Sequence, residues 1–421
     1  MNTRRDFFGW TRNLLAAGGL AGQAVAAPAG AAKQAKKEEG EDYYDKLGVT
    51  KIINAAGTYT ILTASTMPPS VRAAVERAAR HPVRLLELQK AAGEYLARRL
   101  QCEGAMVTAG AASALTLGTA ACMTVANSKE TVDAMPTEVS SLKNEVIVQK
   151  AHRYEYDHAM RNCGIRIVEV ETPSEYEKAF TERTVMTNFF NAAEAGQIGR
   201  EEWIRIAHAH KVPCFNDAAA DVPPISNLWN YTKMGFDLVA FSGGKGMRGP
   251  QNAGLLLGRK DLIEAATRNN NPYGDTVGRG MKVAKEQIVG MVAAVDWFLE
   301  QGDEKMQAEF QRRADRIAGV LKGIPSLSAK VFVPPVANHV PHLLIRYDQE
   351  RVKITPQEVA ADLRKGTPSI ELNPATGSTS ASAGLPTDGS TIVVGVWMLE
   401  PGEDLIVARR LHEVLTKAAA A

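Results

Sequence analysis

One stretch of the chain, residues 237–258, constrains the fold more than any other. An apolar run ends in Ser242-Gly-Gly-Lys245, and a second apolar run follows after further glycines and a proline. Both runs are short and bounded by turn residues, which is typical of buried strands. Lys245 is therefore expected in a tight turn between two strands, where glycines let the backbone approach a ligand closely. A lysine placed in this way can lose solvation and become a nucleophilic amine. A surface lysine in a hairpin is the alternative.

Two nucleotide-binding patterns overlap this stretch, and both fail. Residues 244–249 match G-x-G-x-x-G, but that motif needs a helix directly after it to place a positive dipole behind a pyrophosphate. Here Pro250 and the leucines at 255–257 predict a second strand instead. A P-loop is excluded because Val239 stands where its first glycine belongs and Gly246 replaces the Ser or Thr that holds magnesium.

The composition is that of an ordinary globular protein. A chain of 421 residues that is 45% hydrophobic can bury a large core and is expected to form two or more domains. The formal net charge is +2, with acids and bases interspersed, so the electrostatic signature of a nucleic-acid-binding protein is missing. The four cysteines are far apart in apolar segments and contain no C-x-x-C pair, which favours buried hydrophobic roles over a zinc site. We expect no metal.

The N-terminus resembles a twin-arginine export signal. Thr3-Arg-Arg-Asp-Phe-Phe8 precedes a weakly apolar segment, residues 14–27, that is too short for a membrane span. Ala24-Val-Ala26 offers the small-residue spacing of a cleavage site. We expect a signal over residues 1–32, a charged linker over 33–46, and export of the folded protein to the periplasm. A disordered, alanine-rich leader with chance arginines is the alternative.

Predicted strands and helices alternate along the rest of the chain, which favours an α/β fold with a mostly parallel, doubly wound sheet. A long helical segment from residue 281 leads to a second group of strands and helices. We therefore expect a large domain over residues 47–299 and a small C-terminal α/β domain over residues 300–421. Strands are expected near residues 51–54, 105–108, 146–148, 165–168, 184–188, 212–217, 238–242, 255–257, 331, 343–345, 369–371 and 392–394. Helices are expected over residues 68–80, 83–100, 110–126 and 200–211, and from 172, 281, 355 and 403.

Two segments that follow predicted strands carry candidate ligand-binding groups. Gly110, Ala111 and Ala112 lie in a small-residue turn that opens a helix, where free backbone N–H groups and the helix dipole favour an anion. Close packing explains small residues there equally well. His152-Arg-Tyr154-Glu-Tyr-Asp-His158 follows the strand at 146–148, at the end of a parallel sheet where ligands bind.

Asp217 ends a predicted strand 28 residues before Lys245. A carboxylate in that place can keep a pyridine nitrogen protonated, so that the ring accepts electrons. A strand-ending Asp can also be an N-cap or a turn residue. Together with Lys245, however, it favours a pyridoxal 5'-phosphate (PLP) enzyme with a Schiff-base lysine.

These segments together resemble fold-type I PLP-dependent enzymes, and more closely the group of selenocysteine synthase and D-glucosaminate-6-phosphate ammonia-lyase. The resemblance runs from about Leu47 to the end of the chain. It rests on Ile53-Asn54-Ala-Ala-Gly57-Thr58, Thr108-Ala-Gly110-Ala-Ala112, Asp217-Ala-Ala-Ala with Pro223-Pro224, Phe241-Ser242-Gly-Gly-Lys245 with Gly249-Pro250-Gln251, and Gly280-Met-Lys282-Val-Ala-Lys285-Glu286.

The resemblance implies a role for each candidate residue. Lys245 would hold PLP and then move protons at the substrate's α-carbon, and Asp217 would pair with the ring nitrogen. The residues 110–112 would bind the phosphate with help from the Ser242 hydroxyl. His152 would stack on the cofactor ring, with Tyr154 and His158 as competitors. Asn54 and Thr58 would lie near the substrate.

The chain departs from the family in two respects. Selenocysteine synthase has an N-terminal tRNA-binding region, whereas we expect an export signal at that place in this chain, so a charged tRNA is not the expected substrate. Many fold-type I enzymes bind the substrate carboxylate through an arginine near the strand expected at 369–371, where this chain has Glu371. Arg346 is the substitute candidate, and a solvated charge at a strand end is its alternative role.

We therefore expect an exported PLP-dependent enzyme acting at the α-carbon of an amino acid or amino-sugar acid. An α,β-eliminating ammonia-lyase is the first expectation. A PLP-dependent transferase, racemase or aldolase is the second, because the same lysine and ring serve all of them. A non-catalytic ligand-binding descendant is the third. The expected partners are a small-molecule amine and further copies of the chain, as a dimer or larger homo-oligomer, with no nucleic acid and no membrane after signal removal.

Overall fold

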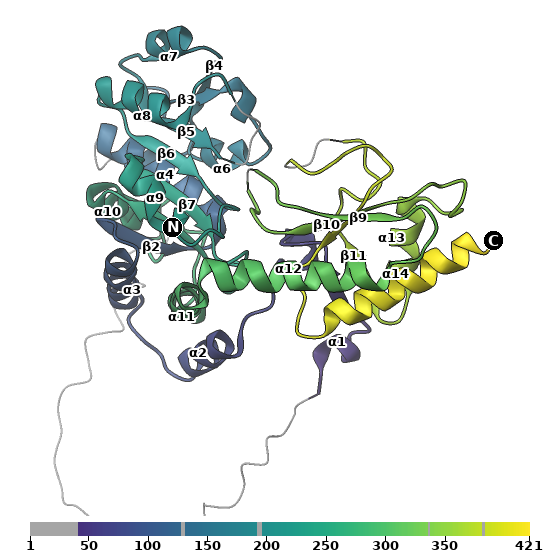
Figure 1. Ribbon diagram of the computed structural model, residues 1–421. Helices are drawn as coiled ribbons and strands as arrows, with labels where there is room; N and C mark the ends of the chain where they lie inside the picture. Colours follow the sequence, from purple (N-terminus) through teal and green to yellow (C-terminus); the bar gives the residue numbers. More distant parts are fainter. Residues whose placement is uncertain (1–40, 128–130, 192–195, 336, 381–383) are drawn as a thin grey trace, which may run out of the picture. The chain divides into compact units, whose positions relative to one another are not determined.

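The computed structural model describes residues 41–127, 131–191, 196–335, 337–380 and 384–421 (Figure 1). The chain divides into two compact units, Met1–Thr50 and Lys51–Ala421. The expected export signal, residues 1–32, lies outside the described residues. In the first unit the described part contains one helical turn, α1 (Tyr43–Lys46), which begins where the Asp42 side chain accepts a hydrogen bond from the Tyr44 N–H at 2.9 Å. The charged composition of residues 33–46 had led us to expect a linker there, and α1 lies within this range. All that follows concerns the second unit.

A seven-stranded sheet forms the centre of this unit. Its strand order is β2-β8-β7-β6-β5-β3-β4. All neighbouring strands are parallel except β8, which lies between β2 and β7 and runs antiparallel to both. The predicted mostly parallel, doubly wound sheet is thereby confirmed. The strands are β2 (Gly104–Thr108), β3 (Glu145–Gln149), β4 (Arg166–Val170), β5 (Thr184–Phe190), β6 (Cys214–Asp217), β7 (Leu238–Ser242) and β8 (Gly254–Gly258).

Helices cover both faces of this sheet (Figure 1). Side chains alternate between the faces along each strand, so that Met106 belongs to an apolar cluster with residues of α4, α6 and α10, whereas Val107 belongs to a cluster with residues of α3, α8, α9 and α11. Helix α4 is rich in small residues because it lies close to the sheet. A side-chain carbon at Gly118 would stand 2.4 Å from the ring of Phe215. The helices of this part are α2 (Pro69–Ala79), α3 (Leu85–Arg99), α4 (Gly110–Ala126), α5 (Thr131–Ala134), α6 (Asp157–Arg161), α7 (Pro173–Ala179), α8 (Arg200–Ala209), α9 (Asn227–Met234), α10 (Lys260–Arg268) and α11 (Lys285–Gln301), of which α2 packs on α11 and α5 on α4.

Two smaller sheets and three helices make up the C-terminal part together with one N-terminal strand. Strand β1 (Ile52–Ala55) pairs in parallel with β11 (Ser369–Leu372), and β10 (His342–Arg346) pairs in antiparallel fashion with β9 (Ser328–Phe332) and β12 (Ile392–Gly395). The helices α12 (Asp303–Val320), α13 (Pro356–Lys365) and α14 (Glu403–Ala419) share one apolar core with these strands. In the described part of the chain, 3₁₀ turns are formed by Thr60–Leu62 and Lys150–His152.

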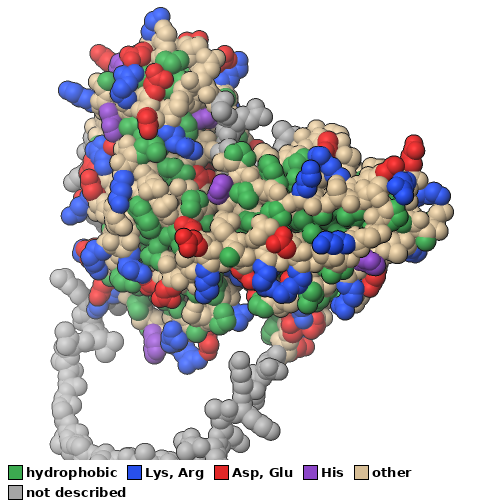
Figure 2. Space-filling model, in the orientation of Figure 1, with side chains coloured by type: hydrophobic (Ala, Val, Ile, Leu, Met, Phe, Trp, Pro, Cys, Tyr) green, Lys and Arg blue, Asp and Glu red, His purple; other side chains and the backbone are tan. Residues whose placement is uncertain are grey.

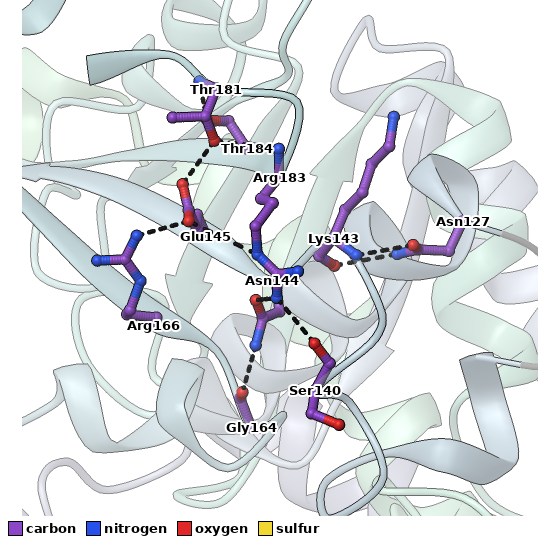
Figure 3. A network of polar contacts seen from close by, with 10 residues as sticks. All are labelled: Asn127, Ser140, Lys143, Asn144, Glu145, Gly164, Arg166, Thr181, Arg183 and Thr184. Atoms are coloured by element: carbon purple, nitrogen blue, oxygen red, sulfur yellow. Dashed lines mark hydrogen bonds and ion pairs between the residues drawn. The ribbon is translucent and has the colours of Figure 1, made fainter.

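A polar network fixes the starts of β3 and β5 (Figure 3). The buried Glu145 carboxylate accepts hydrogen bonds from Arg166 at 2.5 Å and from the Thr181 hydroxyl at 2.7 Å, and Arg183 lies 3.7 Å away. Burial alone would raise the pKa of Glu145, but these partners outweigh it and the pKa is lowered. The network therefore lies at the amino ends of the strands, opposite to the carboxyl ends where the candidate residues gather.

The surface carries mixed charge. On the face drawn in Figure 2, Lys and Arg side chains are interspersed with Asp and Glu side chains. Within the described residues, no helix combines the length and the apolar character needed to cross a membrane.

The cysteines of the described chain are free thiols. Cys122, Cys163 and Cys214 are buried, as expected, and Cys102 is half-buried, with burial raising its pKa to about 11. Among the described residues no group of His, Cys, Asp and Glu is arranged to hold a metal ion.

Candidate active site at the strand ends

The parallel strands β2, β3, β5, β6 and β7 all end at the same edge of the central sheet. There the antiparallel β8 begins, and its first residue, Gly254, is in register with Thr108 on one side and Ser242 on the other. Asp217 is in register with Ala240, two residues before Ser242. The carboxyl ends of parallel strands are where ligands bind in open α/β folds. Residues that are separated by more than 100 positions in the sequence therefore meet at this edge.

Lys245 lies in the turn between β7 and β8, as predicted. Its glycine neighbours are required by close backbone contacts, because a side-chain carbon at Gly244 would lie 2.6 Å from the Gln251 Cα, and one at Gly246 would lie 2.2 Å from the Val222 carbonyl oxygen. The helix that a dinucleotide motif needs does not follow the turn, since β8 does. Burial lowers the pKa of the Lys245 amine, and negative charge on Asp217 and Asp221 opposes this only in part.

Asp217 ends β6 and is 2% exposed. The Tyr154 hydroxyl donates a hydrogen bond to its Oδ2, and the Ala219 N–H donates to its Oδ1 at 3.0 Å. Burial raises the pKa of this carboxyl group, although both donors and the charge of Lys245 lower it. The hydrogen bond from Ala219 fits the alternative role of Asp217 as a turn residue. The hydrogen bond from Tyr154 is not explained by that role.

Helix α4 begins directly after β2 and presents its first turn at this edge. Gly110 has a φ of 84°, and the N-cap residue Ala109 makes no side-chain hydrogen bond to the turn. A side-chain carbon at Gly254 would lie 2.5 Å from the Gly110 carbonyl carbon and 2.9 Å from the Ala111 nitrogen. The glycine thus lets β8 pass beneath the helix start. Ser113, one turn into the helix, is buried, and its hydroxyl has no partner among the described residues.

The ring-bearing segment after β3 divides into three environments. His152 is buried, packs edge-on against Phe189 at 4.4 Å between ring centres, and accepts a hydrogen bond at Nδ1 from the Phe190 N–H at 3.3 Å. Burial and the charge of Arg200 lower its pKa to about 4. Tyr154 stacks on Phe190 at 3.9 Å and reaches Asp217.

His158 is exposed on α6. Of the three candidate rings, the structure brings Tyr154 into direct contact with Asp217. The stacking role of His152 stays a prediction.

A cavity of about 210 Å³ opens onto Lys245. Thr58 lines it, as the resemblance implied for a residue near the substrate. The described lining residues are Ala56, Gly57, Thr58, Tyr59, Thr60, Tyr156, Lys245, Pro334, Asn338, His342, Asn373, Leu385 and Trp397. The walls therefore come from the N-terminal segment after β1, from the segment after β3, from the lysine turn and from the C-terminal part.

Two predicted substrate residues lie outside the cavity lining. Asn54 shapes the turn after β1, because its amide group makes four hydrogen bonds of 3.0–3.1 Å with the backbone of residues 56, 57 and 64. Arg346 donates to the Thr391 hydroxyl at 2.7 Å and pairs with Asp388. Glu371, at the position where an arginine was expected, is paired with Arg364. The substrate roles of Asn54 and Arg346 stay predictions.

Two buried polar residues that the sequence reasoning missed lie close to the named ones. Asn188, in the middle of β5, is fully buried, and neither side-chain polar atom has a partner in the described part of the chain. Asp221 accepts a hydrogen bond from the Tyr231 hydroxyl at 2.9 Å, and burial raises its pKa to about 6. A weak signal existed for Asn188, because it is the one amide in a strand that otherwise consists of Thr, Val, Met and Phe. A single acid in a short turn gave no comparable signal for Asp221.

The residues at this edge fit PLP. The uncapped start of α4 and the unpartnered Ser113 hydroxyl suit a phosphate group. The buried carboxylate of Asp217 suits a cationic ring N–H, and the unpartnered amide of Asn188 can bind a further polar group of the ring. Lys245, with its lowered pKa, supplies the amine that can hold the cofactor covalently.

Comparisons with known proteins point to the same chemistry. The family described as "SelA: L-seryl-tRNA selenium transferase" matches residues 52–312. D-glucosaminate-6-phosphate ammonia lyase of Salmonella typhimurium is 27% identical over 393 residues, which are 89% of this chain and 98% of that protein. A 5'-C-glycyluridine monooxygenase-decarboxylase of a Streptomyces species is 31% identical over 343 residues, covering 78% and 83% of the two chains.

A solved structure of D-glucosaminate-6-phosphate ammonia-lyase superposes with a TM-score of 0.77 at 26% sequence identity, covering 90% of this chain and 99% of the other. The fold-type I resemblance is confirmed, the chain is an enzyme, and its cofactor is PLP. With the family match spanning well over half of its residues, the chain belongs to the SelA (L-seryl-tRNA selenium transferase) family of PLP-dependent enzymes.

Proposed function

We propose that the protein is a PLP-dependent ammonia-lyase that eliminates a β-substituent from an amino acid or amino-sugar acid. The observation that carries this proposal is the placement of Lys245 in a cavity wall, with the buried Asp217 at the same strand ends. The similarity to an ammonia-lyase over 98% of that protein's length supports the reaction type.

When bound, PLP supplies an electron-accepting ring that stabilises negative charge at the α-carbon. The chain's own residues do the rest. Because burial lowers its pKa, the Lys245 amine can be neutral and accept the α-proton. Asp217 holds positive charge at the ring nitrogen. The β-substituent leaves with the electron pair of its bond, and a hydroxyl takes up a proton to leave as water. The released enamine tautomerises to an imine, and hydrolysis of the imine gives a keto acid and ammonia.

The decisive experiment uses the purified protein and its Lys245→Ala variant. Borohydride reduction should fix PLP on the peptide that contains Lys245, and the variant should retain no fixed PLP. The wild type should release ammonia from an amino acid or amino-sugar acid in a 1:1 ratio with keto acid. Fixation on another lysine would contradict the assignment. Oxygen uptake with release of carbon dioxide, as the name of the Streptomyces relative indicates for that protein, would favour a decarboxylase instead.

We also propose that the protein is exported folded, with its cofactor in place, to the periplasm. Arg4 and Arg5 ahead of a short apolar segment support this proposal. Replacing both by Lys should leave an uncleaved, PLP-loaded protein in the cytoplasm. Recovery of the native protein from the cytoplasm with residues 1–26 intact would contradict it. A homo-oligomer remains a prediction from the family resemblance, and sedimentation of the loaded protein would measure its size.

A further inference from the structure

The C-terminal part contributes Pro334, Asn338, His342, Asn373, Leu385 and Trp397 to the cavity wall. The Asn373 amide is already hydrogen-bonded to neighbouring groups, and we call the other three polar residues, Asn338, His342 and Trp397, the polar wall. His342 begins β10 and is in register with Gly395 at the end of β12, two residues before Trp397. His342 and Trp397 are each 2% exposed. Two members of the wall are thus held at adjacent strand ends, which fix side chains more firmly than a loop can.

His342 presents a hydrogen-bond acceptor. Its Nδ1 lies 2.9 Å from the Val340 carbonyl oxygen, which can only accept, so Nδ1 carries the hydrogen. Burial lowers the pKa of the ring, which is therefore neutral at ordinary pH. In a neutral imidazole with hydrogen on Nδ1, Nε2 has a free lone pair. No hydrogen bond to Nε2 is made by the described residues.

Trp397 and Asn338 add one donor and one acceptor. The Trp397 indole N–H is buried and has no partner in the described part of the chain. The indole nitrogen lies beside Gly57, where a side-chain carbon would stand 3.5 Å from it. The Asn338 Oδ1 is likewise buried and unpartnered among the described residues, and the Asn338 N–H holds its backbone to the Ala220 carbonyl at 2.8 Å.

We propose that Asn338, His342 and Trp397 form a specificity-determining subsite for an uncharged, hydroxyl-bearing side chain of the substrate. This inference rests on the proposed function, because it names the substrate class of the same cavity.

The donors and acceptors on the wall favour a hydroxyl over a phosphate. A hydroxyl group both donates and accepts, so it can satisfy the indole N–H together with a lone pair of His342 or Asn338. A phosphate dianion only accepts, so it would leave both acceptors unpaired and would bring negative charge against their lone pairs. Leaving a buried polar group unpaired is costly, and sites built on hydroxyl contacts discriminate strongly for that reason. Hydrogen bonding to the polar wall therefore favours a substrate whose side chain carries hydroxyl groups and no phosphate.

The test compares three amines on the PLP-loaded protein by titrating its visible absorbance. They are D-glucosaminate, its 6-phosphate, and norleucine, which has a six-carbon chain without hydroxyls. D-glucosaminate should bind most tightly. Preferred binding of the 6-phosphate, or equal binding of norleucine, would overturn the proposal without any variant being made.

Variants then assign the selectivity to the wall. Trp397→Phe removes the N–H and keeps an aromatic ring, and His342→Asn keeps a donor near the Nδ1 position while it removes the Nε2 acceptor. Each should weaken D-glucosaminate binding by roughly 3- to 10-fold, the loss typical of one neutral hydrogen bond. Norleucine binding should change by less than about twofold, because norleucine makes no such bond.

A matched control is Trp203→Phe. Trp203 is fully buried, and its indole N–H also has no partner among the described residues, but it packs on Tyr176 on the α8 side of the sheet, outside the cavity lining. This variant should bind all three amines as the wild type does. Equal weakening of every amine by Trp397→Phe would show a structural role and overturn the proposal.

The binding of D-gluconate, measured by calorimetry, separates this inference from the proposed function. D-gluconate carries the hydroxyls but no amine, so it needs no reaction at Lys245. If no amine is turned over but Trp397→Phe still weakens D-gluconate selectively, the lyase proposal fails and the subsite stands. If amines are turned over and neither D-gluconate nor D-glucosaminate responds to the variants, the subsite fails alone.

Discussion

The Tyr154 hydroxyl donates a hydrogen bond to Asp217 Oδ2, joining the segment after β3 to the end of β6. Tyr154 is in turn stacked on Phe190, the last residue of β5, with 3.9 Å between the ring centres. Three neighbouring strand ends therefore cooperate in orienting one buried carboxylate. A hydrogen bond to the charged form of a carboxyl group favours that form. Burial has the larger effect and raises the pKa of Asp217, and the hydrogen bond from Tyr154 offsets part of that rise.

Tyr154→Phe should shift the acid side of the pH–rate profile. Without the hydroxyl, the pKa of Asp217 rises, so a larger fraction of the enzyme carries an uncharged Asp217 at any given pH. The rate at low pH should fall by roughly tenfold, the effect typical of one hydrogen bond to a charged group, and should recover as the pH rises. Profiles of kcat/KM against pH measure this. Tyr176→Phe, which removes another buried hydroxyl bonded to the Trp203 carbonyl at 3.2 Å, should leave the profile in place.

Asp217→Asn should keep PLP and lose most activity. A neutral amide fills the same space but cannot hold positive charge at the ring nitrogen. The expected loss is about two to four decades in kcat, the usual range for an acid–base contribution. Absorbance of the bound cofactor and steady-state rates give both quantities. An Asp217→Asn enzyme within threefold of the wild type would show that the carboxylate has another task.

The sequence predicted the sheet well because its signals are local. Most strands of the central sheet contain a short apolar run bounded by turn residues, and the capping box Thr355-Pro-Gln-Glu358 marks the start of α13 correctly. Lys245 was identified because it stands in the turn that follows such a run, and Asp217 because it ends a strand. Asp217 alone could equally have been an N-cap or a turn residue, and the presence of Lys245 28 residues later favoured a cofactor-binding role.

Long-range pairing could not be read from these patterns. The pairing of β1 with β11 joins residues more than 300 positions apart, and the C-terminal sheet brings His342 beside Trp397. Neither histidine nor tryptophan stood out in its own segment, because what matters is that residues with unpartnered polar atoms line a shared cavity. Asn54 was placed near the substrate through its neighbours in the motif, and only the structure shows that its amide is occupied by the turn.

Gly254→Ala should weaken PLP binding. The added carbon would lie 2.5 Å from the Gly110 carbonyl carbon, so the start of α4 must move away from β8 and its N–H groups with it. Overpacking of this kind costs about 1–3 kcal/mol. Equilibrium dialysis measures the loss of PLP affinity, and thermal unfolding measures the loss of stability. Gly319→Ala is the control, because its added carbon meets nothing within 4 Å on α12 and an alanine there favours the helix.

The stability of the cofactor-free protein should fall between pH 6.5 and pH 4 through His152. Its pKa is lowered to about 4 by burial and by the charge of Arg200, whereas an unfolded chain protonates its histidines near 6.5. The unfolded state therefore binds more protons over this interval, so the free energy of unfolding decreases as the pH falls. Protonation at Nδ1 would also break the hydrogen bond from the Phe190 N–H.

His152 accounts for a loss of stability on the order of 3 kcal/mol. Urea unfolding of the wild type and of His152→Gln measures it. The variant should lose distinctly less stability over the same interval, and His158→Gln, an exposed control, should lose as much as the wild type. Parallel curves for the wild type and His152→Gln would contradict the prediction.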